Sequence, residues 1–232
     1  MPLQISIPMD MPAKLAPTPM RWKGPAPFGD LWAGHHRLIY ADPNWLFNLH
    51  SAKGEGKSPQ AHYDCMPTEE ICALPVEPLA YLDCALFLWG TWPMMARGDV
   101  HRVARAWGFE PKTGGSWAKL SSTGAKLQFG SGFILRSANE PFLICTRGNP
   151  KIRDTTEARS VRNLLIDADV PFTSEWSITA PVREHSRKPD NTIDMIETLF
   201  DGPYLELFAR TRRRGWSSWG NQVDMFKGDE PA

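Results

Sequence analysis

The sequence has no excess of charge of either sign. Its 26 Lys and Arg residues balance 26 Asp and Glu residues, so the formal net charge at neutral pH is zero. This argues against a protein that binds nucleic acid by bulk positive charge alone, although local basic patches remain compatible with it. No apolar run reaches the roughly 18 residues that a membrane-spanning helix requires. The first residues lack a basic segment followed by an apolar one, so we expect neither a secretory signal nor a membrane partner.

Cysteine is scarce, and the spacing of the cysteines does not suggest a paired motif. The four residues show no Cys-x-x-Cys pair, and the six histidines show no metal-ligand spacing. This pattern favours reduced thiols in a cytoplasmic protein over a zinc site or a disulfide framework, and we expect no metal. The chain is nevertheless 42% hydrophobic, which is enough for an ordinary core.

The length of 232 residues suits one domain with flanking segments. Residues 1–30 hold seven prolines and little periodicity, so we expect an irregular arm. Residues 31–226 are expected to form the single domain. Residues 227–232 read as a short polar tail.

Short apolar runs alternate with helical patterns along the domain. The runs 37–41, 85–89, 141–145 and 204–209 predict buried strands. Apolar residues recur at helical spacing from Val100 to Trp107 and again after Pro189, and Thr68 is the expected N-cap of a shorter helix. Alternating strands and helices predict an α/β fold with helices on both faces of a sheet.

The first of these strands ends abruptly at Asp42-Pro43-Asn44-Trp45. In open α/β folds, ligands bind beyond the carboxyl ends of the strands. A carboxylate and a proline carbonyl suit the two N–H donors of an exocyclic amine on a planar base, and Trp45 could stack on that base. The alternative is an Asp-Pro loop with a tryptophan in the core.

Several segments taken together extend this interpretation. The runs LIYADPNW, HYDCMPTEEICALP, ALFLWGTWP, SANEPFLICTRGNP, REHSRKPDNTIDMIETLF and YLELFARTRRRGWSSWGNQVD occur in this order over residues 37–226. In order and spacing they resemble the MT-A70 family of adenine N6-methyltransferases, and the compact bacterial and phage members in particular. The resemblance implies a class I, Rossmann-like methyltransferase fold that uses S-adenosylmethionine. It also implies a circularly permuted motif order, in which the catalytic strand precedes the cofactor strand.

The resemblance assigns roles to individual residues. Asp42, Pro43 and Trp45 match the catalytic Asp-Pro-Pro-Trp tetrad, and Asn44 departs from it at the second proline. Lys188 matches a lysine that approaches the carboxylate of the cofactor. The implied cofactor-binding residues are Asp42, Lys188, Glu206, Phe208, Arg210, Asn221 and Gln222.

Three further segments each allow more than one interpretation. Arg212, Arg213 and Arg214 are candidates for phosphate contacts, and a solvated loop explains them equally well. The glycine-rich residues 129–133 are interpreted as a turn near the substrate rather than a cofactor loop. Residues 163–178 look like an insertion, facing either the substrate or only solvent.

From these residues we expect methyl transfer from S-adenosylmethionine to the N6 amine of adenine in nucleic acid, with DNA favoured over RNA. One alternative is an inactive, methyltransferase-like subunit that binds nucleic acid within a homo- or hetero-oligomer. Another is transfer to cytosine N4 or to a protein amide. The presence of both Asp42 and Lys188 favours catalysis, in the cytoplasm of a bacterial or phage-infected cell.

Overall fold

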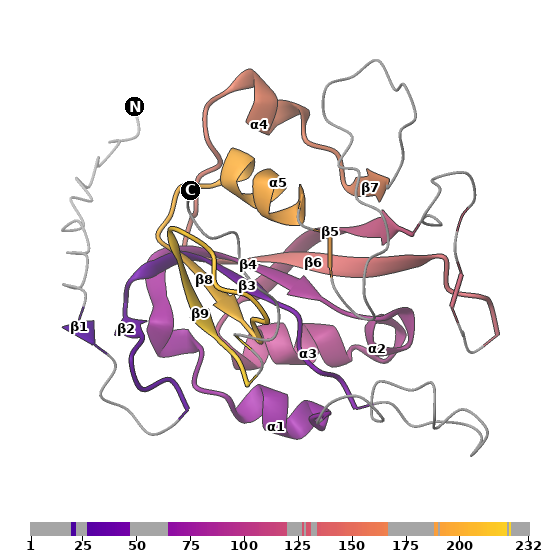
Figure 1. The fold of residues 1–232 in the computed structure, drawn as a ribbon, viewed down its shortest axis with the longest axis horizontal. Helices are drawn as coiled ribbons and strands as arrows, with labels where there is room; N and C mark the ends of the chain where they lie inside the picture. Colours follow the sequence, from indigo (N-terminus) through magenta and orange to yellow (C-terminus); the bar gives the residue numbers. More distant parts are fainter. Residues whose placement is uncertain are drawn as a thin grey trace, which may run out of the picture.

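The structure is a computed structural model. It describes residues 20–21, 27–46, 65–119, 127, 129–130, 134–166, 188–189, 191–221 and 223. Its centre is a seven-stranded sheet with the strand order β7-β5-β6-β4-β3-β8-β9 (Figure 1). The strands are β3 (His36–Ala41), β4 (Ala80–Trp89), β5 (Glu110–Ala118), β6 (Asn139–Arg147), β7 (Leu164–Ile166), β8 (Tyr204–Leu207) and β9 (Trp216–Trp219).

Most of the sheet runs in one direction. β3 is parallel to both β4 and β8, and β8 is parallel to β9. β6 is antiparallel to β4 and β5, so β5 again points the same way as β3. The carboxyl ends of β3, β4, β5, β8 and β9 therefore lie along one edge of the sheet, together with the first residues of β6.

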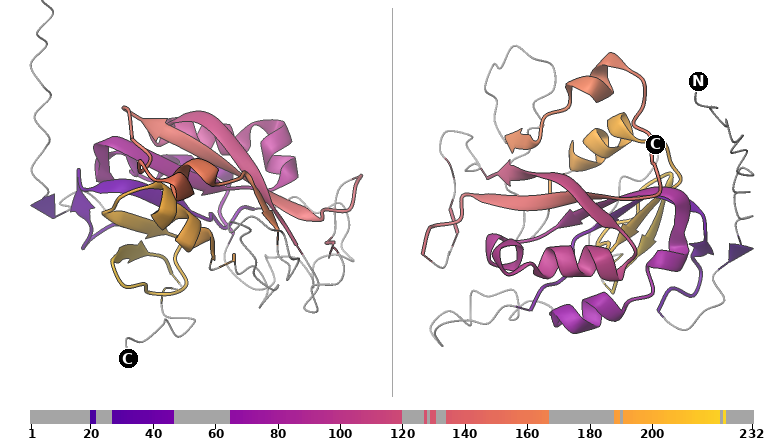
Figure 2. Two further views of the ribbon diagram at one scale, coloured as in Figure 1. Left: turned by 90° about the horizontal axis from the view of Figure 1, so that it is seen from above. Right: turned by 180° about the vertical axis from the view of Figure 1, so that it is seen from behind.

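Helices cover both faces of this sheet, as the alternating pattern predicts. One face carries α1 (Thr68–Ala73), α2 (Trp92–Arg97) and α3 (Asp99–Ala106), and the other carries α4 (Thr156–Ser160) and α5 (Asn191–Leu199). The two helix layers lie on opposite sides of the twisted sheet (Figure 2). This arrangement confirms the α/β fold class.

The alternation of side chains along the strands separates two buried clusters. Ile39 and Ala41 of β3 pack in the cluster that includes Val103 of α3 and Trp107, which follows that helix. Leu38 and Tyr40 of the same strand pack in the cluster that includes Ile196 of α5. A strand whose successive side chains are buried on opposite faces needs an almost continuous apolar run, which is why residues 37–41 could be recognised in the sequence.

The strands β3 and β8 lie side by side despite their separation along the chain. Ala41 at the end of β3 pairs with Leu207 at the end of β8, so the residues that follow each strand emerge next to each other. The early strand carries the Asp-Pro turn and the late strand carries the proposed cofactor loop. This pairing of an early strand with a late one is compatible with the permuted motif order that the family resemblance implies.

Several local predictions need correction. Pro67, not Thr68, occupies the N-cap position of α1, and no side chain caps that helix. α5 begins at Asn191, two residues after Pro189. Within the arm that was expected to be irregular, Met20–Arg21 forms β1 and pairs antiparallel with β2 (Trp32–Ala33). The first part of the stretch 163–178 is β7, an edge strand of the sheet, and residues 167–178 lie outside the described residues.

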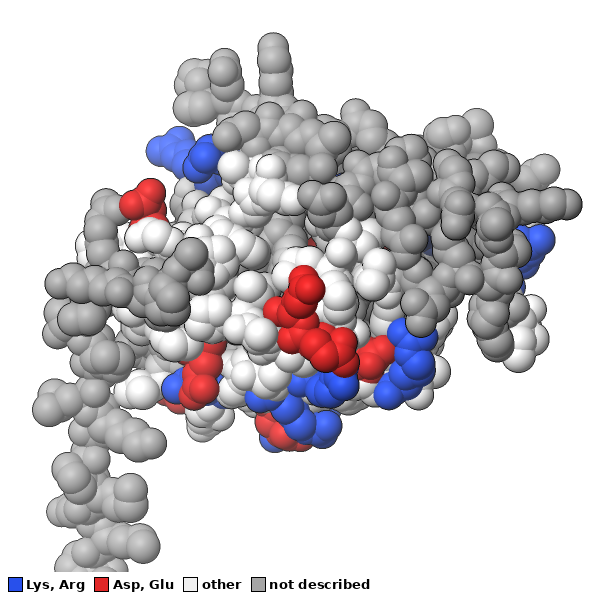
Figure 3. Space-filling view, turned by 90° about the horizontal axis from the view of Figure 1, so that it is seen from below, with Lys and Arg blue, Asp and Glu red and all other residues white. Residues whose placement is uncertain are grey.

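Charged side chains on the side of α1 are mixed in sign. Figure 3 shows acidic and basic groups next to one another on this face. The pairs include Arg102 Nη2 with Glu69 Oε1 at 2.8 Å and Arg97 Nη2 with Asp99 Oδ2 at 2.9 Å. All four cysteines are free thiols. None of the described helices is long and apolar enough to cross a membrane.

Candidate active site

Ionisable side chains converge at the carboxyl edge of the sheet. Asp42 directly follows β3, Lys119 directly follows β5, and Glu140 is the second residue of β6. Lys188 comes from the segment before α5. Because all of these positions lie on the edge where parallel strands end, the site has the location at which open α/β sheets bind ligands.

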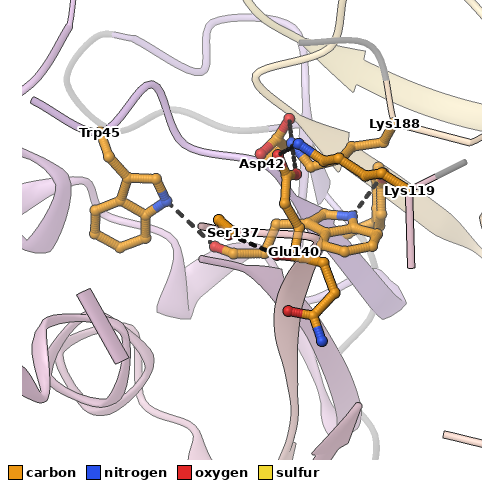
Figure 4. A network of polar contacts seen from close by, with 9 residues as sticks. Asp42, Trp45, Lys119, Ser137, Glu140 and Lys188 are labelled. Carbon is orange, nitrogen blue, oxygen red and sulfur yellow. Dashed lines mark hydrogen bonds and ion pairs between the residues drawn. The ribbon is translucent and has the colours of Figure 1, made fainter. Parts of the chain in front are cut away.

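Lys188 is the centre of this network (Figure 4). Its Nζ lies 2.7 Å from Asp42 Oδ2 and 3.2 Å from Glu140 Oε2. The other carboxylate oxygen of Glu140 accepts a hydrogen bond from Lys119. The carboxylate of Glu140 therefore binds the ammonium groups of Lys188 and Lys119. Lys188 also contacts the carboxylate of Asp42.

The network is well shielded from water. The side chain of Lys188 is 12% exposed, and those of Asp42 and Glu140 are 20% and 21% exposed. Burial alone would raise the pKa of the Glu140 carboxyl, but the ammonium groups of Lys188 and Lys119 lower it to about 2. Burial alone would lower the pKa of Lys188, and its two carboxylate partners outweigh this and raise it. Lys188 is therefore a cation and Glu140 an anion at neutral pH.

Lys188 contacts Trp89, which is hydrogen-bonded to Tyr40. The Nζ of Lys188 lies 5.4 Å from the ring centroid of Trp89, within the range of a cation–π contact. The indole Nε1 of Trp89 donates a hydrogen bond to the hydroxyl of Tyr40 at 2.9 Å. Burial, and then the nearby charges of Glu206 and Asp42, raise the pKa of Tyr40 well above its ordinary value, so the phenol stays neutral.

Backbone hydrogen bonds define the turn that carries the tetrad. The N–H of Trp45 donates to the carbonyl of Pro43 at 2.9 Å. The N–H of Met66 donates to the carbonyl of Asn44 at 2.7 Å, and the N–H of Leu46 donates to the carbonyl of Met66 at 3.0 Å. The Pro43 carbonyl thus already accepts one hydrogen bond, and its second lone pair is the one that a substrate amine would need.

Within the tetrad, only Asp42 is partly accessible. Asn44 is 9% exposed and Trp45 is 4% exposed. The indole Nε1 of Trp45 donates to the backbone carbonyl of Trp89 at 3.3 Å, and the ring packs in the cluster below α3. A ring in this position presents no face to a base, so the stacking role expected for Trp45 is not supported, and the core-tryptophan alternative describes it better.

The loops after β8 and β9 are locked together. Phe208 has φ of 60°, a conformation that a bulky residue adopts only where the surroundings require it. The N–H of Ala209 donates to the carbonyl of Trp219 at 2.9 Å. A Cβ on Gly220 would lie 2.4 Å from the carbonyl oxygen of Ala209, so only glycine allows this close approach. The contact brings the predicted cofactor residues Phe208, Arg210 and Asn221 to one place, and Gln222 lies outside the described residues.

The arginine run divides into different environments. Arg213 Nε lies 3.4 Å from Glu206 Oε2, so this arginine pairs with the carboxylate of β8. Arg212 and Arg214 are exposed. Of the three arginines predicted to contact phosphate, Arg213 is therefore partly buried beside Glu206, whereas Arg212 and Arg214 expose their side chains to solvent.

The glycine-rich segment lies away from the cofactor strand. Phe129 and Gly130 belong to the connection from β5 to β6, and the N–H of Gly130 donates to the carbonyl of Ser137 at 2.9 Å. Both ends of this connection are at the carboxyl edge of the sheet, which agrees with a turn near the substrate. Residues 131–133 lie outside the described residues.

Sequence reasoning missed Glu140, Lys119 and Trp89 as parts of this site. Glu140 and Trp89 stand in segments that carry the family resemblance, and Lys119 follows a strand that was not predicted. For Glu140 the sequence held one signal, because this residue directly precedes the apolar run 141–145. Among the described residues, no group of His, Cys, Asp and Glu is arranged to hold a metal ion.

The comparisons with known proteins agree with this geometry. A mostly parallel sheet, with charged residues gathered where its strands end, defines an open α/β protein with a ligand site at the carboxyl edge. The profile of the MT-A70 family matches residues 36–222, and the chain belongs to this family. The family assignment confirms the Rossmann-like methyltransferase fold.

Three relatives illustrate the range of similar proteins. The chain is 29% identical over 204 residues to the type II methyltransferase M.MunI of Mycoplasma sp, covering 81% of this chain and 78% of that protein. It is 31% identical over 195 residues to the N(6)-adenosine-methyltransferase MT-A70-like protein of Arabidopsis thaliana, covering 82% and 24%. It is 29% identical over 195 residues to the human N(6)-adenosine-methyltransferase catalytic subunit METTL3, covering 82% and 29%. The chain thus spans under a third of the length of these plant and human relatives.

Proposed function

We propose that this protein transfers a methyl group from S-adenosylmethionine to the N6 amine of adenine in nucleic acid. The observation that carries the proposal is the position of Asp42, at the end of the strand beside the cofactor strand and in contact with Lys188 at 2.7 Å. The family membership and the names of the plant and human relatives support adenine N6 as the acceptor.

The residues at the carboxyl edge fit the cofactor. Its methionine part carries an ammonium and a carboxylate, and Asp42 and Lys188 are a matching anion and cation. Its ribose hydroxyls require short polar partners, which Asn221 in the turn after β9 can supply. S-adenosylmethionine would contribute an electrophilic methyl group on a sulfonium centre. We assign Asp42, Lys188, Glu206, Phe208, Arg210, Asn221 and Gln222 to its site.

The part played by the protein in transfer is mainly positioning. The lone pair of the adenine amine is delocalised into the ring, so the amine is a poor nucleophile. Hydrogen bonds from its two N–H groups to the Asp42 carboxylate and the Pro43 carbonyl would return electron density to nitrogen and fix its direction. Lys188 contributes by holding the Asp42 carboxylate in one orientation before substrate arrives.

We propose DNA as the preferred substrate, with an adenine that is unpaired or flipped out of the duplex. The match to 78% of a bacterial type II methyltransferase, against under a third of the plant and human proteins, favours the compact bacterial type. Arg212, Arg213 and Arg214 are the proposed phosphate contacts, and of these Arg213 also pairs with Glu206. We further propose that the protein acts in the cytoplasm, which suits its four free thiols, and that it can assemble with a second subunit.

The decisive experiment supplies labelled S-adenosylmethionine with matched single-stranded DNA, duplex DNA and RNA that contain adenine. The modified base is identified by mass spectrometry, and Asp42→Ala serves as the inactive control. N6-methyladenine formed by the wild type alone supports the proposal. Labelled cytosine, or cofactor binding without transfer to any of the three substrates, would overturn it and favour the alternatives of a different amine or an inactive subunit.

A further inference from the structure

A half-exposed tryptophan stands beside the candidate active site. Trp92 is the first residue of α2, and its side chain is 49% exposed. It follows β4 after only two residues, and Figure 1 shows α2 directly beyond the tip of that strand. A large apolar ring left in water at a functional edge is a candidate for contact with a ligand.

The ring of Trp92 is held in one orientation. Its Nε1 donates a hydrogen bond to Asn139 Oδ1 at 2.5 Å, and the amide of Asn139 in turn donates to Ser116 Oγ at 3.3 Å. The polar edge of the indole is therefore fixed to two neighbouring strands, β6 and β5. A ring whose only polar atom is already satisfied offers its faces, and not its edge, to a partner.

The backbone below Trp92 is equally constrained. The N–H of Gly90 donates to the carbonyl of Pro141 at 3.0 Å, which extends the pairing of β4 with β6 past the end of the strand. A Cβ on Gly90 would lie 2.5 Å from Val100 Cγ2, so this residue packs directly on α3. The platform is thus preorganised, and little conformational entropy would be lost when a ligand stacks on it.

The position of the ring relative to Asp42 follows from the register. Ala41 pairs with Leu88, so Asp42 and Trp89 are the next residues of two adjacent strands. Trp92 is three residues beyond Trp89, which limits the separation of their Cα atoms to about 11 Å. The spacing of adjacent strands adds about 5 Å, so the Cα atoms of Trp92 and Asp42 lie within about 16 Å of each other. That distance is comparable with the length of about two nucleotides of an extended strand.

We propose that Trp92 is the stacking platform for a nucleobase of the substrate strand, within one or two nucleotides of the target adenine. This inference rests on the proposed function, because it takes its occupant from the nucleic-acid substrate. The stacking role expected for Trp45 is not supported because that ring is 4% exposed, whereas Trp92 is exposed and fixed at the same edge. Every base has a π face, so the contact would add affinity without reading sequence.

The test measures binding and does not depend on turnover. A fluorescently labelled single-stranded oligonucleotide with one adenine is titrated with wild type, Trp92→Ala and Trp92→Phe in the presence of S-adenosylhomocysteine at constant salt. We expect Trp92→Ala to raise the Kd for the oligonucleotide by about 5- to 150-fold, the range for loss of one stacked base. Trp92→Phe keeps an aromatic face and should lose much less.

A matched control is available at the opposite edge of the sheet. Trp32 of β2 is 38% exposed and precedes the amino end of β3, so Trp32→Ala removes an exposed indole far from Asp42. This variant should bind the oligonucleotide as the wild type does. The Kd for S-adenosylhomocysteine, measured by calorimetry, should be the same for all four proteins.

Abasic substitutions identify the stacked base. Removing the base that lies on Trp92 should raise the Kd of the wild type for the oligonucleotide. The same removal should leave the Kd of Trp92→Ala unchanged. An unchanged Kd for Trp92→Ala, or a loss equal to that of Trp32→Ala, would overturn the platform. A wild type that binds through Trp92 but methylates no adenine would support the platform and refute the proposed function, so the two failures are distinguishable.

Discussion

Replacing Glu140 by glutamine removes the one carboxylate that holds both Lys188 and Lys119. Glutamine has nearly the same shape, so the change leaves the packing of β6 in place and removes mainly charge. In the wild type, Glu140 Oε2 lies 3.2 Å from Lys188 Nζ, and Oε1 accepts from Lys119. In Glu140→Gln, Lys188 keeps Asp42 as its only carboxylate partner among the described residues.

The magnitude follows from the pKa of Glu140. Its value in the folded protein is about 2, against a reference value of 4.5. A depressed folded pKa contributes stability that is fully present above 4.5 and is lost as the pH falls through about 2. The contribution is at most about 3 kcal/mol at pH 7 and falls to about 1 kcal/mol at pH 3. The stability difference between wild type and Glu140→Gln should therefore shrink by about 2 kcal/mol between these pH values.

Urea unfolding at pH 7 and at pH 3 measures this change for both proteins. Glu110→Gln is the matched control, because Glu110 pairs with Arg105 at 3.4 Å and both side chains are more than half exposed. An exposed pair of this kind contributes at most about 1 kcal/mol, so its loss should alter the pH dependence little. A difference for Glu140→Gln that is constant from pH 7 to pH 3 would refute the assignment of Glu140 as the buried counter-ion of the two lysines.

Four further substitutions test the turn and the cofactor loops. Asp42→Ala should lower kcat/KM by an amount equivalent to about 3 kcal/mol or more, and the protein should still fold because Lys188 keeps Glu140. Lys188→Ala should weaken S-adenosylhomocysteine binding by about ten- to a hundred-fold in calorimetry, and an unchanged Kd would return this lysine to a structural role. Gly220→Ala should destabilise the protein by about 1–3 kcal/mol and weaken cofactor binding, because its Cβ would meet backbone. Asn44→Pro should keep initial rates within a few-fold of the wild type, and a collapse in rate with intact cofactor binding would make Asn44 a substrate-reading residue.

The sequence predicts the strands that are buried on both faces and misses the others. Residues 37–41, 85–89, 141–145 and 204–209 are mostly apolar because helices cover both sides of β3, β4, β6 and β8. β5 contains Gly114, Gly115 and a proline, and its glycines are required by close packing: a Cβ on Gly115 would lie 1.9 Å from the carbonyl of Asn163. β9 has two serines between two tryptophans and lies at the sheet edge. In both strands local composition reflects tertiary contacts, which a single sequence does not show.

The site shows the same division between local and long-range information. Asp42 could be recognised because an apolar run stops at it, and its place at the carboxyl edge is as predicted. Asp42 and Lys188 are 146 positions apart, so no local pattern predicts their contact. The family resemblance singled out both residues, but it assigned Lys188 to the cofactor and not to Asp42. Glu140 received no role, because a carboxylate with two lysine partners can be recognised only after β5 and β6 are paired.

The departure at Asn44 is explained by what surrounds the turn. A second proline would restrict Pro43 and hold its carbonyl in place by local stiffness alone. Here the same segment is fixed from outside, because Met66 donates to the carbonyl of Asn44 at 2.7 Å and accepts from Leu46 at 3.0 Å. Those two hydrogen bonds make a short parallel bridge between Trp45 and Met66, and the buried indole of Trp45 anchors it to β4. The chain freedom that proline would remove, about 0.4–1 kcal/mol, is small beside this tertiary restraint. Because these tertiary hydrogen bonds restrain the turn, it does not need proline at position 44. The segment that carries Met66 provides the restraint instead.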